Sequence, residues 1–211
     1  MATKTKQTAT KVTKEKPVEL GFIEPSAEKW RLSSAYFSSK FGGHPSWLDL
    51  RRLPSAEEIQ CPKCSGPTKF LLQIYSPLDT DDSFHRTIFL FVCTNQKCCG
   101  EKNCNTNFVV LRCQLRQEND FYSPDPPEYE NSSLAEISPK RFGNNLCHVC
   151  GIKAGKFCSK CKKMWYCSKQ HQELHWKSGN HKKLCKKLDS GEERGKLFCF
   201  TRIFFNNKSR L

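Results

Sequence analysis

The sequence lacks long apolar runs. Only 37% of its residues are hydrophobic, and the mean hydropathy is −0.65. No run approaches the length that spans a membrane, and residues 1–19 contain no apolar segment of the kind found in signal peptides. These absences argue against a membrane protein and against a secreted disulfide scaffold. We therefore expect the 14 cysteines to be reduced, and ten of them to bind metal, in the cytoplasm and nucleus.

Acidic residues are also scarce, and charge is distributed unevenly. The sequence holds 21 Asp and Glu against 35 Lys and Arg, a net charge of +14. Residues 1–16 carry +4 and residues 140–188 carry +12, whereas residues 17–139 carry −4. We interpret residues 1–19 as a disordered basic tail. The lysines of residues 140–188 are interpreted as solvated side chains with weak, non-specific affinity for nucleic acid.

Cysteine is abundant, and eight zinc-ligand residues fall between residues 147 and 185 in the pattern C-x2-C-x7-C-x2-C-x5-C-x3-H-x9-H-x3-C. Thiolates and imidazoles at these spacings are typical of tetrahedral zinc. Because two zinc sites in so short a segment usually interleave, we predict two interleaved sites, with sequential pairing as the alternative. The first set is Cys147, Cys150, Cys167 and His171, and the second is Cys158, Cys161, His181 and Cys185. A segment of this kind is folded by metal rather than by a large apolar core.

Two short helices are expected to carry part of this pattern. His181 and Cys185 are four residues apart, so one helix face presents both. Ser168 is the expected N-cap of the preceding helix, which runs to Trp176. Gly179 is expected to end that helix before the second one begins.

The composition changes between residues 20 and 122, where large apolar and aromatic residues appear. β-branched and aromatic residues gather in three short runs bounded by polar breaks, which predict strands. The three runs are Lys69–Tyr75, Thr87–Cys93 and Phe108–Cys113. Trp47 and Leu48 follow a predicted turn and are expected to be core anchors.

A further C-x-x-C pair stands before these strands. Cys61 and Cys64 need two more ligands, and Cys93 with Cys98 lies after the second strand and can supply them. A hairpin whose two ends each offer a cysteine pair is the layout of a zinc ribbon. Cys99 competes with Cys98 for the fourth position. We therefore expect a third zinc ion here, in addition to two in residues 147–185.

These features predict a small zinc-stabilised α+β fold in five parts. The parts are the basic tail (1–19), a β-rich domain with a zinc ribbon (20–122), a flexible linker rich in Pro, Ser and Glu (123–146), a two-zinc finger with short helices (147–185) and a short carboxy-terminal tail (186–211).

The two-zinc segment resembles a MYND zinc finger, with Tyr166-Cys167-Ser168 and His175-Trp176 in the expected places. His171 departs from the pattern because most such fingers have cysteine there, although histidine also ligates zinc. The resemblance implies a protein-docking module, and several MYND fingers bind proline-rich peptides through a serine, a glutamine and a tryptophan. The matching residues, and so the expected peptide-binding residues, are Ser159, Gln172 and Trp176. Alternatively, Trp176 packs the small core of the finger.

From about Leu20 to Leu188, the finger included, the chain resembles the programmed cell death protein 2 family. The residues that carry this resemblance lie before the finger: Leu20-Gly21-Phe22, Phe41-Gly42-Gly43, Pro45-Ser46-Trp47-Leu48, Cys61-Pro62-Lys63-Cys64, Leu71-Leu72-Gln73-Ile74-Tyr75, Phe84-His85-Arg86, Phe89-Leu90-Phe91, Gln114-Leu115 and Asn119-Asp120-Phe121-Tyr122. In that family the finger is inserted into a larger β-rich domain. Only 23 residues follow Leu188 here, so we expect the carboxy-terminal part of that domain to be missing.

The family resemblance implies a dedicated chaperone of a newly made 40S ribosomal protein, linked to ribosome biogenesis, cell death, proliferation and corepressors. We therefore predict a zinc-binding adaptor that is not an enzyme, because no cofactor-binding glycine motif stands beside the finger. The alternative is a nuclear transcriptional regulator that recruits corepressors through the finger or binds DNA. Sequence-specific reading of DNA is disfavoured because arginine, the main reader of guanine, is scarce in the finger.

Overall fold

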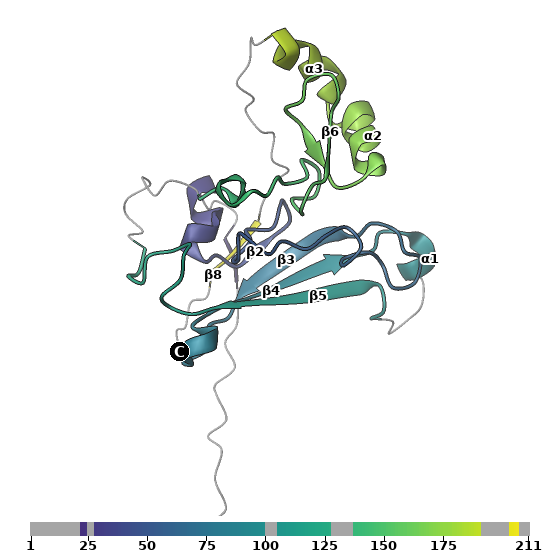
Figure 1. Ribbon diagram of the computed structural model, residues 1–211. Helices are drawn as coiled ribbons and strands as arrows, with labels where there is room; N and C mark the ends of the chain where they lie inside the picture. The colour runs from purple at the N-terminus through teal and green to yellow at the C-terminus, as the bar shows by residue number, and fades with distance from the viewer. Residues whose placement is uncertain (1–21, 25–27, 100–104, 128–136, 191–202, 207–211) are drawn as a thin grey trace, which may run out of the picture.

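The computed structural model describes residues 22–24, 28–99, 105–127, 137–190 and 203–206. Its main feature is a six-stranded antiparallel sheet in the order β1-β8-β2-β3-β4-β5 (Figure 1). The strands are β1 (Phe22–Glu24), β2 (Lys40–Phe41), β3 (Lys69–Tyr75), β4 (His85–Val92), β5 (Phe108–Leu115) and β8 (Ile203–Asn206). The predicted tail at residues 1–19 lies outside the described residues.

The three long strands are those that the apolar runs predict. β3 matches its predicted bounds, β4 begins two residues earlier than expected, and β5 ends two residues later. In β4 the side chains alternate strictly between buried and half-buried positions, and its buried residues include Phe89 and Phe91. This alternation is the two-residue period of a strand with one face on a core. The β-rich character of the domain is therefore confirmed.

The opposite face of the sheet, here called the outer face, is largely apolar. The register aligns Phe41, Leu72, Leu90 and Val110 in one row, Ile74 and Ile88 with Arg112 in the next, and Val92 and Phe108 with Lys69 in a third. Four of these side chains are exposed by 36% or more, namely Phe41, Ile74, Phe108 and Val110. A sheet face that meets water is normally polar, so this face stands out.

The finger consists of a two-stranded ribbon and two helices. The ribbon pairs β6 (Lys156–Phe157) with β7 (Trp165–Tyr166), and the helices are α2 (Lys169–Ser178) and α3 (His181–Ser190). The remaining elements are short: η1 (Lys29–Leu32), η2 (Ser34–Tyr36), η3 (Asp81–Ser83), α1 (Gln96–Cys99) and η4 (Pro139–Phe142). Among the described residues, none of the helices has the length and apolar character needed to cross a bilayer.

The finger and the sheet share one hydrophobic core. Buried residues of the inner sheet face, such as Phe89 and Phe91, belong to the same cluster as Ile152 and Tyr166 of the finger. The Trp47 ring lies between the two parts and packs against Phe89 at 4.7 Å between ring centroids. Figure 1 shows the finger, in green, standing on one side of the sheet. The two predicted modules are therefore in direct contact.

The end of the predicted linker contributes to that contact. Residues 128–136 lie outside the described part of the chain, but residues 137–146 run close to the domain. The Asn144 side chain is buried, and its Nδ2 donates to the carbonyl oxygens of Leu50 and Arg51, both at 2.9 Å. This part of the segment is thus held by the domain rather than being an independent connection.

Residues 203–206 form a strand within the stretch that we expected to be a short tail. β8, yellow in Figure 1, pairs with β1 on one side and with β2 on the other. It thereby joins the first strand of the chain to the rest of the sheet. The run Ile203-Phe204-Phe205 has the residue types of a strand, but the sequence pattern does not indicate where it pairs.

Candidate metal centres

The structure brings twelve cysteine and histidine side chains together in three sets of four. In each set one donor atom from every residue lies within 4.8 Å of the others. The sets are Cys61, Cys64, Cys93 and Cys98; Cys147, Cys150, Cys167 and His171; and Cys158, Cys161, His181 and Cys185. The two finger sets are interleaved along the chain, which is the grouping that the spacing favoured.

The distances inside the sets fit tetrahedral zinc. A Zn–S bond of about 2.3 Å places two sulfurs of a tetrahedron about 3.8 Å apart. The observed Sγ–Sγ distances are 3.7 Å for Cys64–Cys93, 3.6 Å for Cys150–Cys167 and 3.8 Å for Cys158–Cys185. A disulfide would need about 2.05 Å, so these thiols are not paired covalently. All-sulfur and sulfur–imidazole donor sets select zinc over hard cations such as magnesium.

Three cysteine pairs have the same backbone conformation, here called the knuckle. In each, the residue after the second cysteine has a left-handed φ, between 52° and 72°, and donates its N–H to the carbonyl of the first cysteine at 2.8 Å. The three bonds run from Ser65 to Cys61, from Gly151 to Cys147 and from Lys162 to Cys158. Because the set in the sheet domain repeats the knuckle of the finger, the geometry supports metal binding at all three.

The knuckles also favour thiolates. Burial raises the pKa of Cys61, but the backbone N–H groups of Cys64 and Lys63 and the neighbouring thiols outweigh burial and bring the pKa to about 7. In Cys158 burial is again outweighed by backbone N–H groups, and the pKa lies below its usual value. The thiolate is the form that binds metal. The N–H groups around these two knuckles therefore prepare Cys61 and Cys158 for coordination, whereas the neighbouring Cys150 and Cys167 thiols lower the pKa of Cys147.

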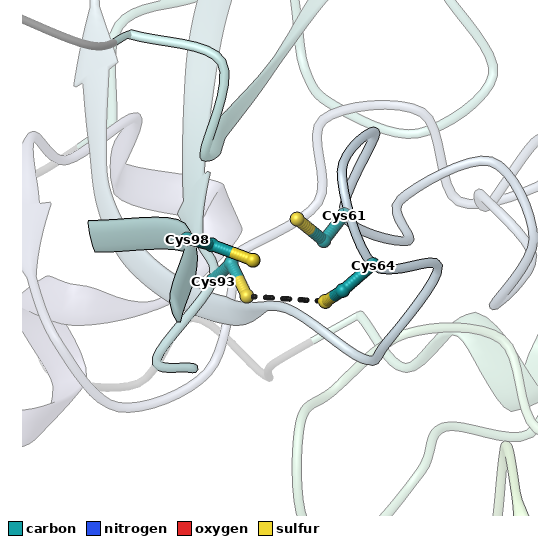
Figure 2. A group of neighbouring side chains, drawn as sticks. All are labelled: Cys61, Cys64, Cys93 and Cys98. Atoms are coloured by element: carbon teal, nitrogen blue, oxygen red, sulfur yellow. Dashed lines mark hydrogen bonds between the residues drawn. The ribbon is translucent and has the colours of Figure 1, made fainter. Parts of the chain in front are cut away.

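In the sheet domain, α1 decides between the two competing cysteines. Figure 2 shows Cys98 turned towards the other three thiols, and its side chain is only 3% exposed. Cys99 is exposed, its Sγ donates to the Cys93 carbonyl at 3.1 Å, and it accepts a bond from Asn107 Nδ2 at 3.6 Å. The structure therefore places Cys98, not Cys99, in the set.

In the finger, α2 and α3 place the histidines. The Ser168 side chain caps α2 by accepting from the His171 N–H at 3.2 Å, as predicted. His171 directs Nδ1 to its set, 3.1 Å from Cys167 Sγ, whereas His181 directs Nε2, 3.5 Å from Cys161 Sγ. Zinc, when bound at these sets, cross-links the ribbon to the helices. The residues themselves supply the positions and orientations of the donors.

Sequence reasoning missed the role of Tyr166, whose side chain is fully buried. Its hydroxyl bonds to Nδ1 of His181 and, at 2.9 Å, to Nδ1 of His175. Because His181 uses Nε2 for its set, Nδ1 carries the proton and donates to the tyrosine oxygen, whose own O–H donates to His175. Burial lowers the pKa of His175 to about 4, which keeps it a neutral acceptor. Tyr166 thus orients His181, a predicted ligand. In the sequence, only the position of Tyr166 beside Cys167 in the motif pointed to this role.

The three predicted peptide-binding residues lie on the finger at different depths. Ser159 is exposed, Gln172 is half-buried in α2, and Trp176 is 38% exposed. The Trp176 ring lies 5.5 Å from the His181 ring, so it both packs on the finger and meets solvent. The peptide groove stays a prediction.

Comparison with known proteins decides the family. Residues 17–129 match the family described as "Programmed cell death protein 2, N-terminal domain", and residues 147–185 match the MYND finger. The chain belongs to the programmed cell death protein 2 family. It is 46% identical over 178 residues to programmed cell death protein 2 of Bos taurus, a match that covers 82% of this chain and 49% of the relative.

Two other matches are more limited. The programmed cell death protein 2-like protein of Mus musculus is 36% identical over 133 residues, covering 63% of this chain and 33% of that protein. Ubiquitin carboxyl-terminal hydrolase 19 of Arabidopsis thaliana is 42% identical over 66 residues, covering 30% of this chain and 10% of the hydrolase. The chain spans about half the length of the programmed cell death protein 2 relatives that it matches. No solved structure matches.

Proposed function

We propose that this chain is a zinc-organised adaptor or chaperone that holds a 40S ribosomal protein during ribosome biogenesis, in the cytoplasm and nucleus. The observation that carries the proposal is the apolar outer face of the sheet. Val110 is 59% exposed and lies in a wholly apolar row, and Ile74 is 44% exposed and lies beside Ile88. Contiguous exposed apolar surface is typical of protein-interaction sites. The names of the relatives support a link to cell death.

Charge supports a basic client. Residues 17–139 carry a net charge of −4 within a chain of net charge +14. Where β3 ends and β4 begins, a hollow is lined by three carboxylates, one arginine and an exposed aromatic ring. These residues are Asp79, Asp81, Glu118, Arg116 and Phe84. Opposite charge accelerates the encounter of two proteins and favours the correct orientation. A basic ribosomal protein fits such a surface.

The metal sets support a role without catalysis. Each of the three sets offers four protein donors, and eleven of the twelve residues are buried or half-buried, Cys64 being the exposed one. A zinc ion with four protein ligands has no open position for a water or a substrate, which is the arrangement of structural rather than catalytic zinc. We infer that three zinc ions shape this chain and that none of them carries a reaction.

The apolar face can be tested by placing charge on it. Val110→Glu and Ile74→Glu, each measured in the full chain, should abolish capture of a 40S ribosomal protein, because a desolvated carboxylate costs several kcal/mol at an apolar interface. Phe157→Glu is the matched control, since Phe157 is 47% exposed but lies on the finger. Capture is checked with the purified ribosomal protein. Undiminished binding by both face variants would contradict the proposal.

A second function, recruitment of corepressors in the nucleus, is favoured by the finger itself. MYND fingers are protein-interaction modules, and Trp176 offers an exposed aromatic face of the kind that proline-rich peptides contact. Trp176→Ala should abolish binding of a proline-rich peptide while the zinc content stays the same. Normal ribosomal-protein capture by this variant would separate the two functions.

A further inference from the structure

The finger carries a concentrated positive charge that neither its metal sets nor its packing requires. Residues 140–188 hold thirteen Lys and Arg and a single acid, Glu173. That acid already lies 3.9 Å from Lys169 on the same helix. Six thiolates with two zinc ions would subtract only two charges, so the finger stays strongly positive.

Seven of these lysines surround the second finger set. Three of them lie in or just after the knuckle of that set, and four lie on α3. All seven are exposed: Lys160, Lys162, Lys163, Lys182, Lys183, Lys186 and Lys187. We call these residues the lysine surface. The knuckle and the helix are fixed to one another because Cys158 and Cys161 share a set with His181 and Cys185. Lys163 also reaches across, donating from Nζ to the Leu188 carbonyl at 2.6 Å.

From this arrangement we propose that the lysine surface binds single-stranded nucleic acid through its phosphates. Lys182 and Lys186, like Lys183 and Lys187, are four residues apart on α3, a separation similar to that of successive phosphates along a strand. Lysine is a compact point charge suited to phosphate contacts, and phosphate contacts carry no sequence information. The surface contains no arginine, so it binds without reading bases.

An exposed aromatic ring at the edge of the lysine surface favours nucleic acid over an acidic peptide. The Trp176 ring is 38% exposed and lies 5.5 Å from the ring of His181, the residue before Lys182. Single-strand binding proteins combine a positive track with aromatic rings on which bases stack. An acidic peptide would use the lysines but has no planar base for the indole. The combination therefore identifies a single strand as the ligand.

The test is a titration of the zinc-loaded full chain against a fluorescent 20-nucleotide RNA, with the same sequence as single-stranded DNA and as a duplex. Binding should weaken with salt at a slope of about −0.7 per phosphate contact, or about −3.5 for five contacts. Single-stranded RNA and DNA should bind more tightly than the duplex, and a difference between the two single strands identifies the preferred sugar. Tighter binding of the duplex would overturn the proposal.

Charge reversal locates the surface. Lys182→Glu, Lys183→Glu and Lys186→Glu combined should weaken binding at least tenfold at 50 mM salt. The matched control combines Lys140→Glu, Lys153→Glu and Lys156→Glu, which change the net charge equally but lie outside the lysine surface. Zinc content is measured for both triple variants. If the α3 variant loses metal, Lys→Gln at the same three α3 positions is used in its place. Equal weakening of RNA binding by both triple variants would show a general effect of charge and would overturn the site.

Two further arms separate nucleic acid from other anions. Trp176→Ala should weaken single-strand binding about tenfold while leaving the salt slope unchanged, because stacking adds no ionic contact. Polyglutamate, and vesicles of phosphatidylserine with phosphatidylcholine, should compete poorly at equal salt. Tighter binding of either polyanion than of the single strand would overturn the proposal. None of these substitutions touches the outer face, so the adaptor function can fail or succeed independently.

Discussion

Gly151 is a residue of the finger that packs closely against the sheet domain. Its φ is +72°, and a Cβ atom there would lie 2.9 Å from both His44 Cβ and Pro45 Cδ. Its carbonyl oxygen accepts the Trp47 Nε1–H at 2.6 Å. We predict that Gly151→Ala lowers the free energy of unfolding by about 2–4 kcal/mol, the sum of left-handed strain and overpacking. Urea unfolding of the zinc-loaded chain measures this.

Two other glycines separate the contributions of strain and overpacking. Gly143 has a φ of +78° but no atom within 4 Å of an added Cβ, so Gly143→Ala should cost only the backbone strain, about 1 kcal/mol. Gly155 has neither constraint, and Gly155→Ala should leave stability nearly unchanged. If all three variants lower the free energy of unfolding equally, the close approach at Gly151 makes no contribution to stability.

At the scale of elements, α1 is a four-residue helix with one cysteine turned inward and the next turned outward. Cys98 lies in the sheet-domain set, whereas the Cys99 thiol bonds to the Cys93 carbonyl. We predict that Cys98→Ser lowers the zinc content of the purified chain from three ions to two, and that Cys99→Ser leaves it at three. Elemental analysis of the two variants makes this comparison. Zinc loss from the Cys99 variant alone would exchange the two assignments.

Elements that depend on local chemistry could be predicted from the sequence. The knuckle pairs are three residues apart, so spacing alone brings Cys61 to Cys64 and Cys158 to Cys161. The apolar runs likewise predict β3 and β5, because a strand's residue types reflect its own burial. The pairing of β8 could not be predicted: its partner Lys40–Phe41 lies more than 160 residues earlier, and no local pattern encodes a register over that distance.

At the scale of the whole molecule, the sequence marks Trp47 as a core residue but does not say what covers it. Its indole is only 5% exposed, and its N–H bonds to Gly151, 104 residues away in the sequence. His44 Nε2 lies 3.2 Å from the Val149 carbonyl, within the same knuckle. Composition therefore predicted two modules, whereas the packing joins them because the first finger knuckle forms part of the domain's core.

This joint core predicts that the first finger set stabilises the sheet. Cys150→Ser should loosen the knuckle whose Val149 and Gly151 carbonyls hold His44 and Trp47, and Trp47 packs on Phe89 of β4. We expect amide hydrogen exchange in β4 to accelerate at least tenfold, because a local opening that becomes easier by about 1.4 kcal/mol raises exchange by that factor.

The matched variant is Cys161→Ser, which opens the second finger set instead. Its knuckle, Cys158–Cys161, bonds back to Met164 and Lys162 within the finger rather than to residues 44–54. Exchange in β4 should therefore respond less to Cys161→Ser than to Cys150→Ser, although both lose one zinc ion. Equal protection of β4 in wild type and both variants would mean that the finger rests on the sheet without stabilising it. A graded response would instead show that metal binding in the finger sets the stability of strands more than 50 residues away in sequence.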